Sequence, residues 1–198
     1  YNMRIIAGMA KGITLSTPTS DRTRPSSDRV KEAIFSALQN EIDIQGLNVV
    51  DLFAGTGALG LEAISRGARD CTFVEKNQEM CKVIKTNVEK VKKAVLQYET
   101  IQPVFKIISS DVEKVVRGAE RSDTLNNADF DIAICDPPYA FDYINIINII
   151  KPGGIVIYET NKEKFEIFRR NIETDGNIEK IIYSKIIGDT GVVVATLQ

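Results

Sequence analysis

The chain has 198 residues, which suits one domain with a large core or one domain with a small extension. Its 25 Lys and Arg residues are balanced by 27 Asp and Glu residues, so a net charge of −2 excludes a generally basic nucleic-acid-binding surface unless the charge is patterned. The chain has three scattered cysteines and no histidine, so we expect no metal site. We also expect a cytoplasmic protein, because the sequence shows no apolar run near the ~20 residues of a membrane span and no signal-peptide pattern.

Residues 1–42 are predicted to form an N-terminal extension. Residues 3–7 and 12–15 are typical of a short hairpin, and Ser26 or Ser27 is a typical N-cap for the helix that follows. The extension is therefore expected to be a hairpin and a helix, placed before the main domain at residues 43–198.

Arginines are concentrated in this extension. Its first 32 residues hold six basic residues against three acids. We expect Arg22, Arg24 and Arg29 to bind phosphate groups, because guanidinium is the better bidentate phosphate ligand. The six lysines of residues 76–93 are interpreted instead as the solvated face of a helix.

A glycine turn follows the first apolar strand of the main domain. Residues 49–60 contain a strand, the pattern Gly-x-Gly-x-x-Gly and the start of a helix. Gly55 and Gly57 permit a tight turn and let a ligand approach the backbone, while Gly60 lets helix and strand pack closely. The strand before and the helix after give this pattern the context of a nucleotide-binding βαβ unit.

Two acids near this turn favour one class of nucleotide over another. Glu75 ends the second strand, where an acid accepts hydrogen bonds from ribose hydroxyls; a solvated strand-end charge is the alternative. Asp51 stands four residues before Gly55, where a carboxylate can face a cationic cofactor. S-adenosylmethionine carries a sulfonium and an ammonium group, whereas a carboxylate would repel the pyrophosphate of NAD.

The remaining elements alternate between strands and helices, which predicts a doubly wound α/β sheet, mostly parallel, with helices on both faces. The carboxyl ends of its strands should then meet at one edge. After the second strand the expected elements are a helix at 77–94, a strand at 105–109, a short helix to about 117, a loop at 118–129, a strand at 130–135, a helix at 141–150, a strand at 154–159, a helix at 161–170, and an antiparallel pair at 178–187 and 191–197.

The turn Asp136-Pro137-Pro138-Tyr139 follows the apolar strand 130–135. Proline has no N–H and fixes its own φ, so the carbonyls around Pro137 are free to accept hydrogen bonds. A planar amino group on a nucleobase fits such a turn, since it offers two N–H donors to Asp136 and the Pro137 carbonyl and a π-face to Tyr139. A tight loop after a strand is the alternative.

Together these motifs resemble the bacterial 16S rRNA guanine-N2 methyltransferase family of class I S-adenosylmethionine-dependent methyltransferases. The resemblance implies methylation of the exocyclic amine of a guanine in 16S rRNA, free or in an assembling small ribosomal subunit. The stretches that carry it are 4–8, 23–35, 51–63, 65–68, 136–139 and 188–190.

The resemblance assigns roles to individual residues. The implied catalytic residues are Asp136, Pro137, Pro138 and Tyr139, and the arginines named above would contact the RNA. The implied cofactor-binding residues are Asp51, Phe53, Gly55, Thr56, Gly57, Gly60, Glu75, Lys76, Asp111 and Val112. Asp111 would accept the adenine amino group with Val112 against the ring, although a helix N-cap explains an aspartate there equally well.

One departure from the family pattern is a short segment after the catalytic turn, where 13 residues separate Tyr139 from Gly153. Three other functions compete with the rRNA methyltransferase. The first is an amino methyltransferase that acts on DNA adenine or cytosine, on another RNA or on a protein glutamine. The second is a nicotinamide oxidoreductase, and the third is a non-catalytic RNA-binding module with the same fold.

Overall fold

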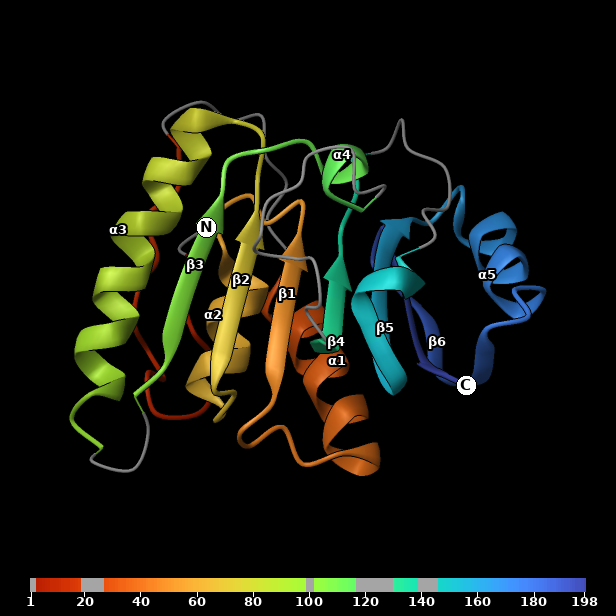
Figure 1. The fold of residues 1–198 in the computed structure, drawn as a ribbon, viewed down its shortest axis with the longest axis horizontal. Helices are drawn as coiled ribbons and strands as arrows, with labels where there is room; N and C mark the ends of the chain where they lie inside the picture. Colours follow the sequence, from red (N-terminus) through yellow and green to blue (C-terminus); the bar gives the residue numbers. More distant parts are fainter. Residues whose placement is uncertain (1–2, 19–26, 99–101, 117–129, 139–145) are drawn as a thin grey trace.

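The computed structural model describes residues 3–18, 27–98, 102–116, 130–138 and 146–198. The described helices and strands follow one another from the N-terminal helix to a C-terminal hairpin (Figure 1). In chain order they are α1 (Asp28–Glu41), β1 (Asn48–Leu52), α2 (Ala58–Ser65), β2 (Asp70–Val74), α3 (Gln78–Val95), β3 (Val104–Ile108), α4 (Val112–Val116), β4 (Phe130–Cys135), the 3-10 turn η1 (Ile147–Ile149), β5 (Ile150–Asn161), α5 (Phe165–Glu173), β6 (Ile178–Ile187) and β7 (Thr190–Leu197).

The strands form one seven-stranded sheet in the order β3-β2-β1-β4-β5-β7-β6. The first five strands of this order run parallel, and β7 pairs antiparallel with both β5 and β6. The order reverses between β1 and β4, which is the point where open α/β sheets bind ligands. The predicted mixed α/β sheet with its antiparallel C-terminal pair is confirmed.

Helices cover both faces of the sheet and bury two apolar layers. Alternate strand residues point to opposite faces, so Val49 packs in the layer under α1, α2 and α3, while Val50 packs in the layer under α4 and α5. The central strands β1, β2 and β4 are buried on both faces, as parallel strands usually are. Asp51 shares the face of Val49 and therefore lies on the α2 side.

One predicted helix is wrong in the part that the structure describes. Residues 139–145 lie outside the described residues, but the expected helix over 141–150 is replaced at its end by the turn η1 and by β5, which starts at Ile150. The isoleucines there are β-branched and favour a strand. Strand β5 then continues past Pro152, where the pairing with β4 shifts register, as a proline inside a sheet requires.

The expected N-terminal hairpin is present as a narrow antiparallel pairing. The amide of Ile5 donates to the Ile13 carbonyl at 3.0 Å, and that of Leu15 donates to the Met3 carbonyl at 2.9 Å. The helix that follows begins after Ser27, whose hydroxyl accepts a hydrogen bond from the Val30 amide at 3.3 Å.

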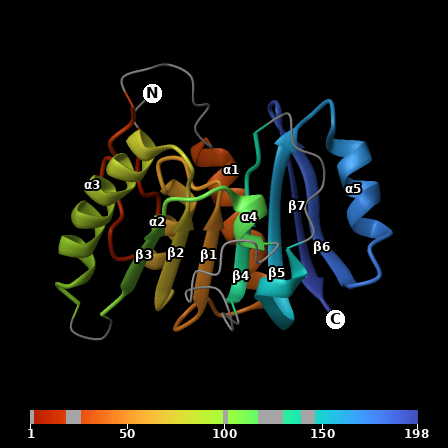
Figure 2. The ribbon, with the colours of Figure 1, turned by 45° about the horizontal axis from the view of Figure 1, so that its top comes forward.

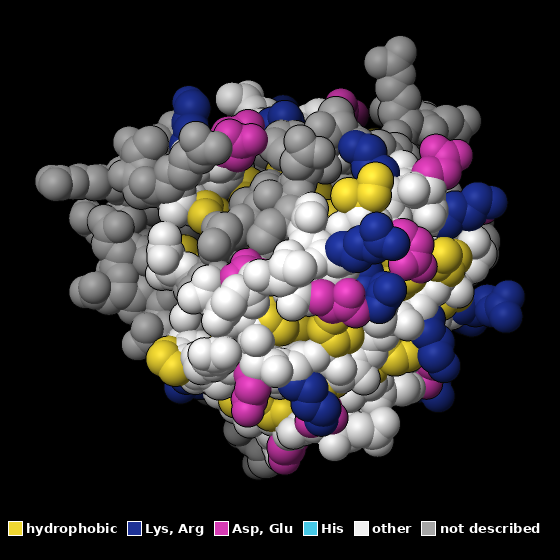
Figure 3. Space-filling view, turned by 90° about the vertical axis from the view of Figure 1, so that its right-hand side faces the viewer, with side chains coloured by type: hydrophobic (Ala, Val, Ile, Leu, Met, Phe, Trp, Pro, Cys, Tyr) yellow, Lys and Arg dark blue, Asp and Glu magenta, His cyan; other side chains and the backbone are white. Residues whose placement is uncertain are grey.

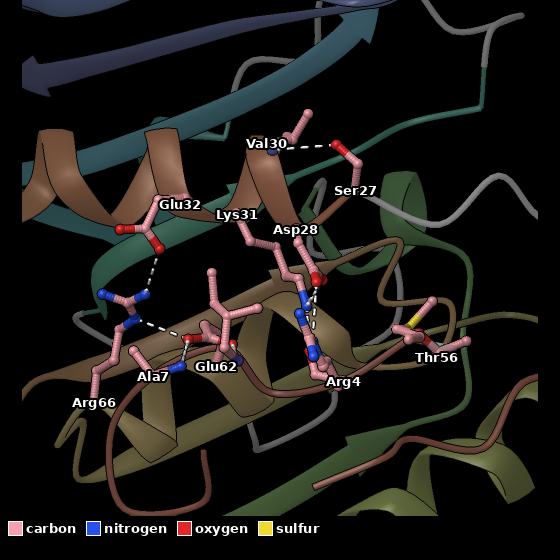
Figure 4. A network of polar contacts seen from close by, with 12 residues as sticks. Arg4, Ala7, Ser27, Asp28, Val30, Lys31, Glu32, Thr56, Glu62 and Arg66 are labelled. Atoms are coloured by element: carbon pink, nitrogen blue, oxygen red, sulfur yellow. Dashed lines mark hydrogen bonds and ion pairs between the residues drawn. The ribbon is translucent and has the colours of Figure 1, made fainter. Parts of the chain in front are cut away.

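This N-terminal segment lies beside α2 and α3 (Figure 2). Glu62 of α2 is fully buried and accepts hydrogen bonds from the amides of Ile6 at 2.9 Å and Ala7 at 3.0 Å. The Nε of Arg66 donates to the same carboxylate at 2.9 Å (Figure 4). These partners compensate a buried charge that would otherwise be costly, so Glu62 fixes the segment on α2.

A second buried charge joins the segment to α1. Lys31 is fully buried, donates to the Arg4 carbonyl and lies 3.4 Å from the Asp28 carboxylate (Figure 4). The Nε of Arg4 also donates to Asp28, at 3.1 Å. The N-terminal segment is therefore held to both helices through charged hydrogen bonds, which are stronger than neutral ones. Across the described ranges, no helix is both long enough and apolar enough to cross a membrane.

Candidate active site

Three strands place their carboxyl ends side by side at one edge of the sheet. Leu52, the last residue of β1, pairs with Val74 of β2 and with Cys135 of β4. Since each strand ends at this level, Glu75 and Asp136 follow their strands at the same edge as the glycine turn. The separate motifs from which the site was predicted therefore lie together at one edge of the sheet.

The glycine turn has a left-handed backbone at three positions. Gly55 and Gly57 have φ angles of 55° and 77°, and Phe53 has a φ of 58°. Phe53 is the sole non-glycine residue with positive φ in the described part of the chain. A bulky residue in this region is strained, and such strain is concentrated at functional sites.

The carboxylate of Glu75 fastens this turn from the neighbouring strand. It accepts hydrogen bonds from the amide of Gly55 at 2.9 Å and from that of Asn77 at 2.8 Å. Each carboxylate oxygen has a second lone pair, so Glu75 keeps acceptor capacity for the ribose hydroxyls that the sequence predicts there. Lys76, the next residue, is exposed and lies 3.9 Å from the carboxylate of Asp111.

Asp51 is the buried acid of the site. Its Oδ2 accepts a hydrogen bond of 2.9 Å from the amide of Gly60, at the first turn of α2. Burial raises the pKa of this carboxyl well above 3.8, and the charges of Asp136 and Glu75 raise it further, while the Gly60 hydrogen bond lowers it. An ionised Asp51 is therefore costly until a cation comes close.

Gly60 cannot be replaced without moving its neighbours. A Cβ built on Gly60 would lie 2.6 Å from the Cys71 sulfur, 2.6 Å from the Phe73 ring and 3.0 Å from Asp51 Oδ2. The close packing of helix and strand that the motif predicts is thus present, and it holds the Gly60 amide against Asp51.

The proline turn, residues 136–139, begins at the same edge. Asp136 is partly exposed, Pro137 is buried and Pro138 is exposed, so the turn leaves the interior between the two prolines. Desolvation raises the pKa of Asp136 from 3.8 to about 6. This value leaves Asp136 ionised at neutral pH, where its carboxylate is a hydrogen-bond acceptor. Tyr139 lies outside the described residues.

Asp111 and Val112 follow β3 at the same edge. The side chain of Asp111 accepts a hydrogen bond of 2.9 Å from the Glu113 amide, and its carbonyl accepts one from Val115, so it caps the short helix α4. Val112 is buried in the layer under α4. The capping geometry accounts for Asp111, and the cofactor role implied by the family stays a prediction.

Thr56 is hydrogen-bonded on two sides. Its hydroxyl donates to the Met3 sulfur at 3.1 Å, and its carbonyl accepts from the side-chain amide of Asn87 at 3.0 Å. The structure thus turns Thr56 toward the N-terminal segment.

The predicted RNA-contacting arginines are only partly described. Arg29 is exposed on the first turn of α1, whereas Arg22 and Arg24 lie outside the described residues. Arg29 borders a surface pocket between the N-terminal segment and α1, together with a second arginine that the sequence did not single out. The pocket is lined by Arg4, Ile6, Asp28, Arg29, Glu32 and Ala33.

Two further residues were missed from the sequence, although each has a signal in it. Glu62 is a charged residue inside the apolar run of α2, and Asn87 interrupts the apolar stripe of α3 between Ile84 and Val91. Both prove fully buried and hydrogen-bonded. In the described ranges no group of three His, Cys, Asp or Glu residues is arranged to hold a metal ion.

The chain is similar to known proteins over most of its length. The family model described as "Conserved hypothetical protein 95" matches residues 3–190. "Ribosomal RNA small subunit methyltransferase D" of Haemophilus influenzae is 34% identical over 169 residues, covering 82% of this chain and 80% of that protein. "Putative rRNA methyltransferase YlbH" of Bacillus subtilis is 29% identical over 168 residues, covering 81% and 84%.

Solved structures share the fold. "Putative methyltransferase yhhF from Escherichia coli" superposes with a TM-score of 0.72 at 24% identity, covering 100% of this chain and 99% of that one. "SMU.776, a putative methyltransferase complexed with SAH" superposes with a TM-score of 0.68 at 17% identity, covering 94% of this chain and 54% of that one. The sheet is thus the class I methyltransferase fold that the motifs predicted.

Proposed function

Because the chain belongs to the conserved hypothetical protein 95 family, we propose that it is an S-adenosylmethionine-dependent methyltransferase that modifies the exocyclic N2 amine of a guanine in 16S rRNA. Family membership confirms the resemblance noted in the sequence and supports an rRNA substrate. The choice of a guanine amine is supported by the chemistry of the proline turn.

One observation carries the cofactor assignment. Asp51, Glu75 and Asp136 converge at the glycine turn, and burial together with mutual repulsion raises the pKa of Asp51. Acids held together in this way are stabilised by a cation. The sulfonium and ammonium groups of S-adenosylmethionine meet that need, whereas the pyrophosphate of a dinucleotide would add to the repulsion.

The same residues account for how the cofactor would be held. Asp51 would face its cationic end, Glu75 would accept hydrogen bonds from the ribose hydroxyls, and the positive-φ backbone of the turn would allow close approach. When bound, the cofactor supplies an electrophilic methyl group. The protein then has to bring the amine to it in the right orientation.

The proline turn supplies that orientation. The lone pair of a guanine N2 is delocalised into the ring, so the amine is a poor nucleophile. An ionised Asp136 and the Pro137 carbonyl can accept its two hydrogens and direct the lone pair outward. Positioning of this kind lowers a barrier by as much as about 7–11 kcal/mol, so Asp136 need not act as a strong base. Tyr139 would stack on the unstacked base.

The RNA is proposed to approach over the N-terminal extension. Arg29, with Arg22 and Arg24 along the chain, supplies the phosphate contacts, and Arg4 borders the same pocket. The face that carries α5 is a poorer candidate, because basic and acidic side chains alternate on it (Figure 3). There Arg169 pairs with Glu166 at 3.2 Å.

Transfer of a labelled methyl group from S-adenosylmethionine tests the proposal. The acceptors are small ribosomal subunits, naked 16S rRNA and duplex DNA, and all should come from cells that lack this modification. Label in the subunits or the rRNA, and not in the DNA, is the expected result. Label in DNA alone would select the DNA amino methyltransferase, and no label in any acceptor would count against a methyltransferase of nucleic acid.

A further inference from the structure

Asn87 of α3 makes three hydrogen bonds in the interior. Its Oδ1 accepts from the amide of Ser16 at 2.6 Å, and its Nδ2 donates to the carbonyls of Ser16 and Thr56, both at 3.0 Å. The side chain is 0% exposed, so water cannot replace any of these partners. Both of its N–H donors are used, each on a different part of the chain.

The two partners of Asn87 belong to different functional parts. Thr56 lies between the two positive-φ glycines of the cofactor turn, and Ser16 lies near the end of the N-terminal segment. The first described residue of the same segment also contacts the glycine turn, because the Thr56 hydroxyl donates to the Met3 sulfur at 3.1 Å. The glycine turn is therefore bonded to both ends of residues 3–16, directly at Met3 and through Asn87 at Ser16. Residues 3–16 lie beside α2 and α3 (Figure 2).

We propose that Asn87 is a positioning residue that couples the cofactor turn to the N-terminal segment. Holding the Thr56 carbonyl in its cofactor-bound position holds Asn87, and Asn87 then holds Ser16. By linkage the effect is reciprocal, so a ligand that orders the segment also favours the cofactor. This inference rests on the proposed function, because it takes the glycine turn as the cofactor site.

The coupling matters because the segment leads into the arginine-rich stretch. Pro18 is the last described residue before Arg22 and Arg24, and Ser27 is the first described residue after them. Fixing Ser16 fixes one anchor of that stretch, and the N-cap of α1 fixes the other. A cofactor that fixes this anchor therefore favours RNA binding as well.

Hydrogen exchange measured by mass spectrometry tests the coupling without any RNA. The readout is the exchange rate of amides in residues 3–18, with and without saturating S-adenosylhomocysteine. Binding of this product should slow exchange in the segment about 5-fold or more, the lower end of usual site-to-site coupling. Asn87→Ala should bind S-adenosylhomocysteine, measured by calorimetry, yet show no such slowing.

Lys90→Ala is the matched control. The Nζ of Lys90 joins the same segment to the same helix, because it donates to the Thr14 carbonyl at 3.1 Å and to the Ser16 hydroxyl at 2.9 Å. Unlike Asn87, it bonds to the segment and not to Thr56. In Lys90→Ala, binding of S-adenosylhomocysteine should still slow the exchange of amides in residues 3–18. If Asn87→Ala fails to fold, Asn87→Ser serves instead, because the shorter side chain removes the link between Ser16 and Thr56 and keeps a polar group in the interior.

The outcomes separate the two proposals. If the wild type binds S-adenosylhomocysteine and exchange in residues 3–18 does not change, the coupling is wrong and the proposed function stands. Equal loss of slowing in the Asn87 variant and the Lys90 control would also overturn it, because any loosening of the segment would then suffice. If the wild type does not bind S-adenosylhomocysteine, the proposed cofactor is wrong and the inference falls with it.

Discussion

The amide of Gly60 donates a 2.9 Å hydrogen bond to the buried carboxylate of Asp51. This bond joins the end of β1 to the first turn of α2 across the glycine turn. Burial raises the pKa of Asp51, and this hydrogen bond lowers it in part. The bond therefore holds the Asp51 carboxylate in a buried position, where its negative charge becomes favourable when a cationic ligand binds.

Asp51→Asn should stabilise the free protein and weaken cofactor binding. The amide oxygen can still accept from Gly60, while the cost of burying a charge disappears. A raised pKa means that this cost is absent below about 3.8 and grows as pH rises above it, so the gain in Tm should be larger at neutral pH than at pH 4. The affinity for S-adenosylhomocysteine should fall roughly 10- to 100-fold, as for loss of a charged hydrogen bond.

The control for this change is Asp43→Asn, since Asp43 is exposed and its side chain accepts a local hydrogen bond from Gln45 at 3.0 Å. Thermal melts and calorimetry should give wild-type values for it. A less stable Asp51→Asn protein with unchanged affinity would contradict the assigned role.

The pH dependence of methyl transfer should report Asp136. Its pKa is raised to about 6, so the carboxylate that accepts the amine hydrogens is lost as pH falls through about 6. We expect kcat/KM to be constant at neutral pH and to fall about tenfold for each pH unit below 6. Initial rates in buffers of constant ionic strength measure this, and a profile flat to pH 4.5 would contradict it.

Asp136 also makes a prediction about stability. An acid with a raised pKa costs stability above that pKa, and the cost disappears as pH falls toward 3.8. Asp136→Asn should therefore be more stable than the wild type at pH 7, by about 1–2 kcal/mol after allowance for its partial exposure. The difference should vanish near pH 4, as denaturant unfolding at both pH values would reveal.

Gly60→Ala should damage both the fold and the cofactor site. The new methyl group would lie 2.6 Å from the Cys71 sulfur and the Phe73 ring, and overpacking of this kind typically costs about 1–3 kcal/mol. Gly176→Ala is the matched control, because no atom lies within 4 Å of its Cβ position and its φ is not positive. Equal free energies of unfolding for the two variants would refute the packing role.

Tyr139 tests the stacking part of the proposal. Replacement by Ala should lower the rate of transfer more than replacement by Phe, because Phe keeps an aromatic face for the base. The loss with Ala should correspond to about 1–3 kcal/mol, the usual value of one base–aromatic stack. Single-turnover rates on the RNA substrate give the comparison, and full activity of the Ala variant would remove stacking from the mechanism.

Local patterns predicted the parts of the fold that local physics sets. The strand that contains Asp51, the glycines after it and the proline turn after β4 are determined by neighbours a few residues away. Right-handed crossovers then bring them to one edge, which is why their proximity was predictable before any contact was known.

Contacts between distant residues were not predictable. Glu62 binds an amide 56 residues away, and Asn87 binds one 71 residues away. A polar residue in an apolar stripe signals a buried partner but does not say which one. The helix expected up to Ile150 failed for a similar reason, because Ile150 pairs with the distant Phe130 of β4 and so begins a strand.

The identity of the methylated nucleoside tests the central claim most directly. Small ribosomal subunits that lack the modification are incubated with the protein and S-adenosylmethionine, and the rRNA is digested and analysed by mass spectrometry. The expected product is N2-methylguanosine at one position, absent with Asp136→Ala even though that variant still binds S-adenosylhomocysteine. A methyl group on another base, on a ring carbon or on ribose, or none at all, would contradict the account.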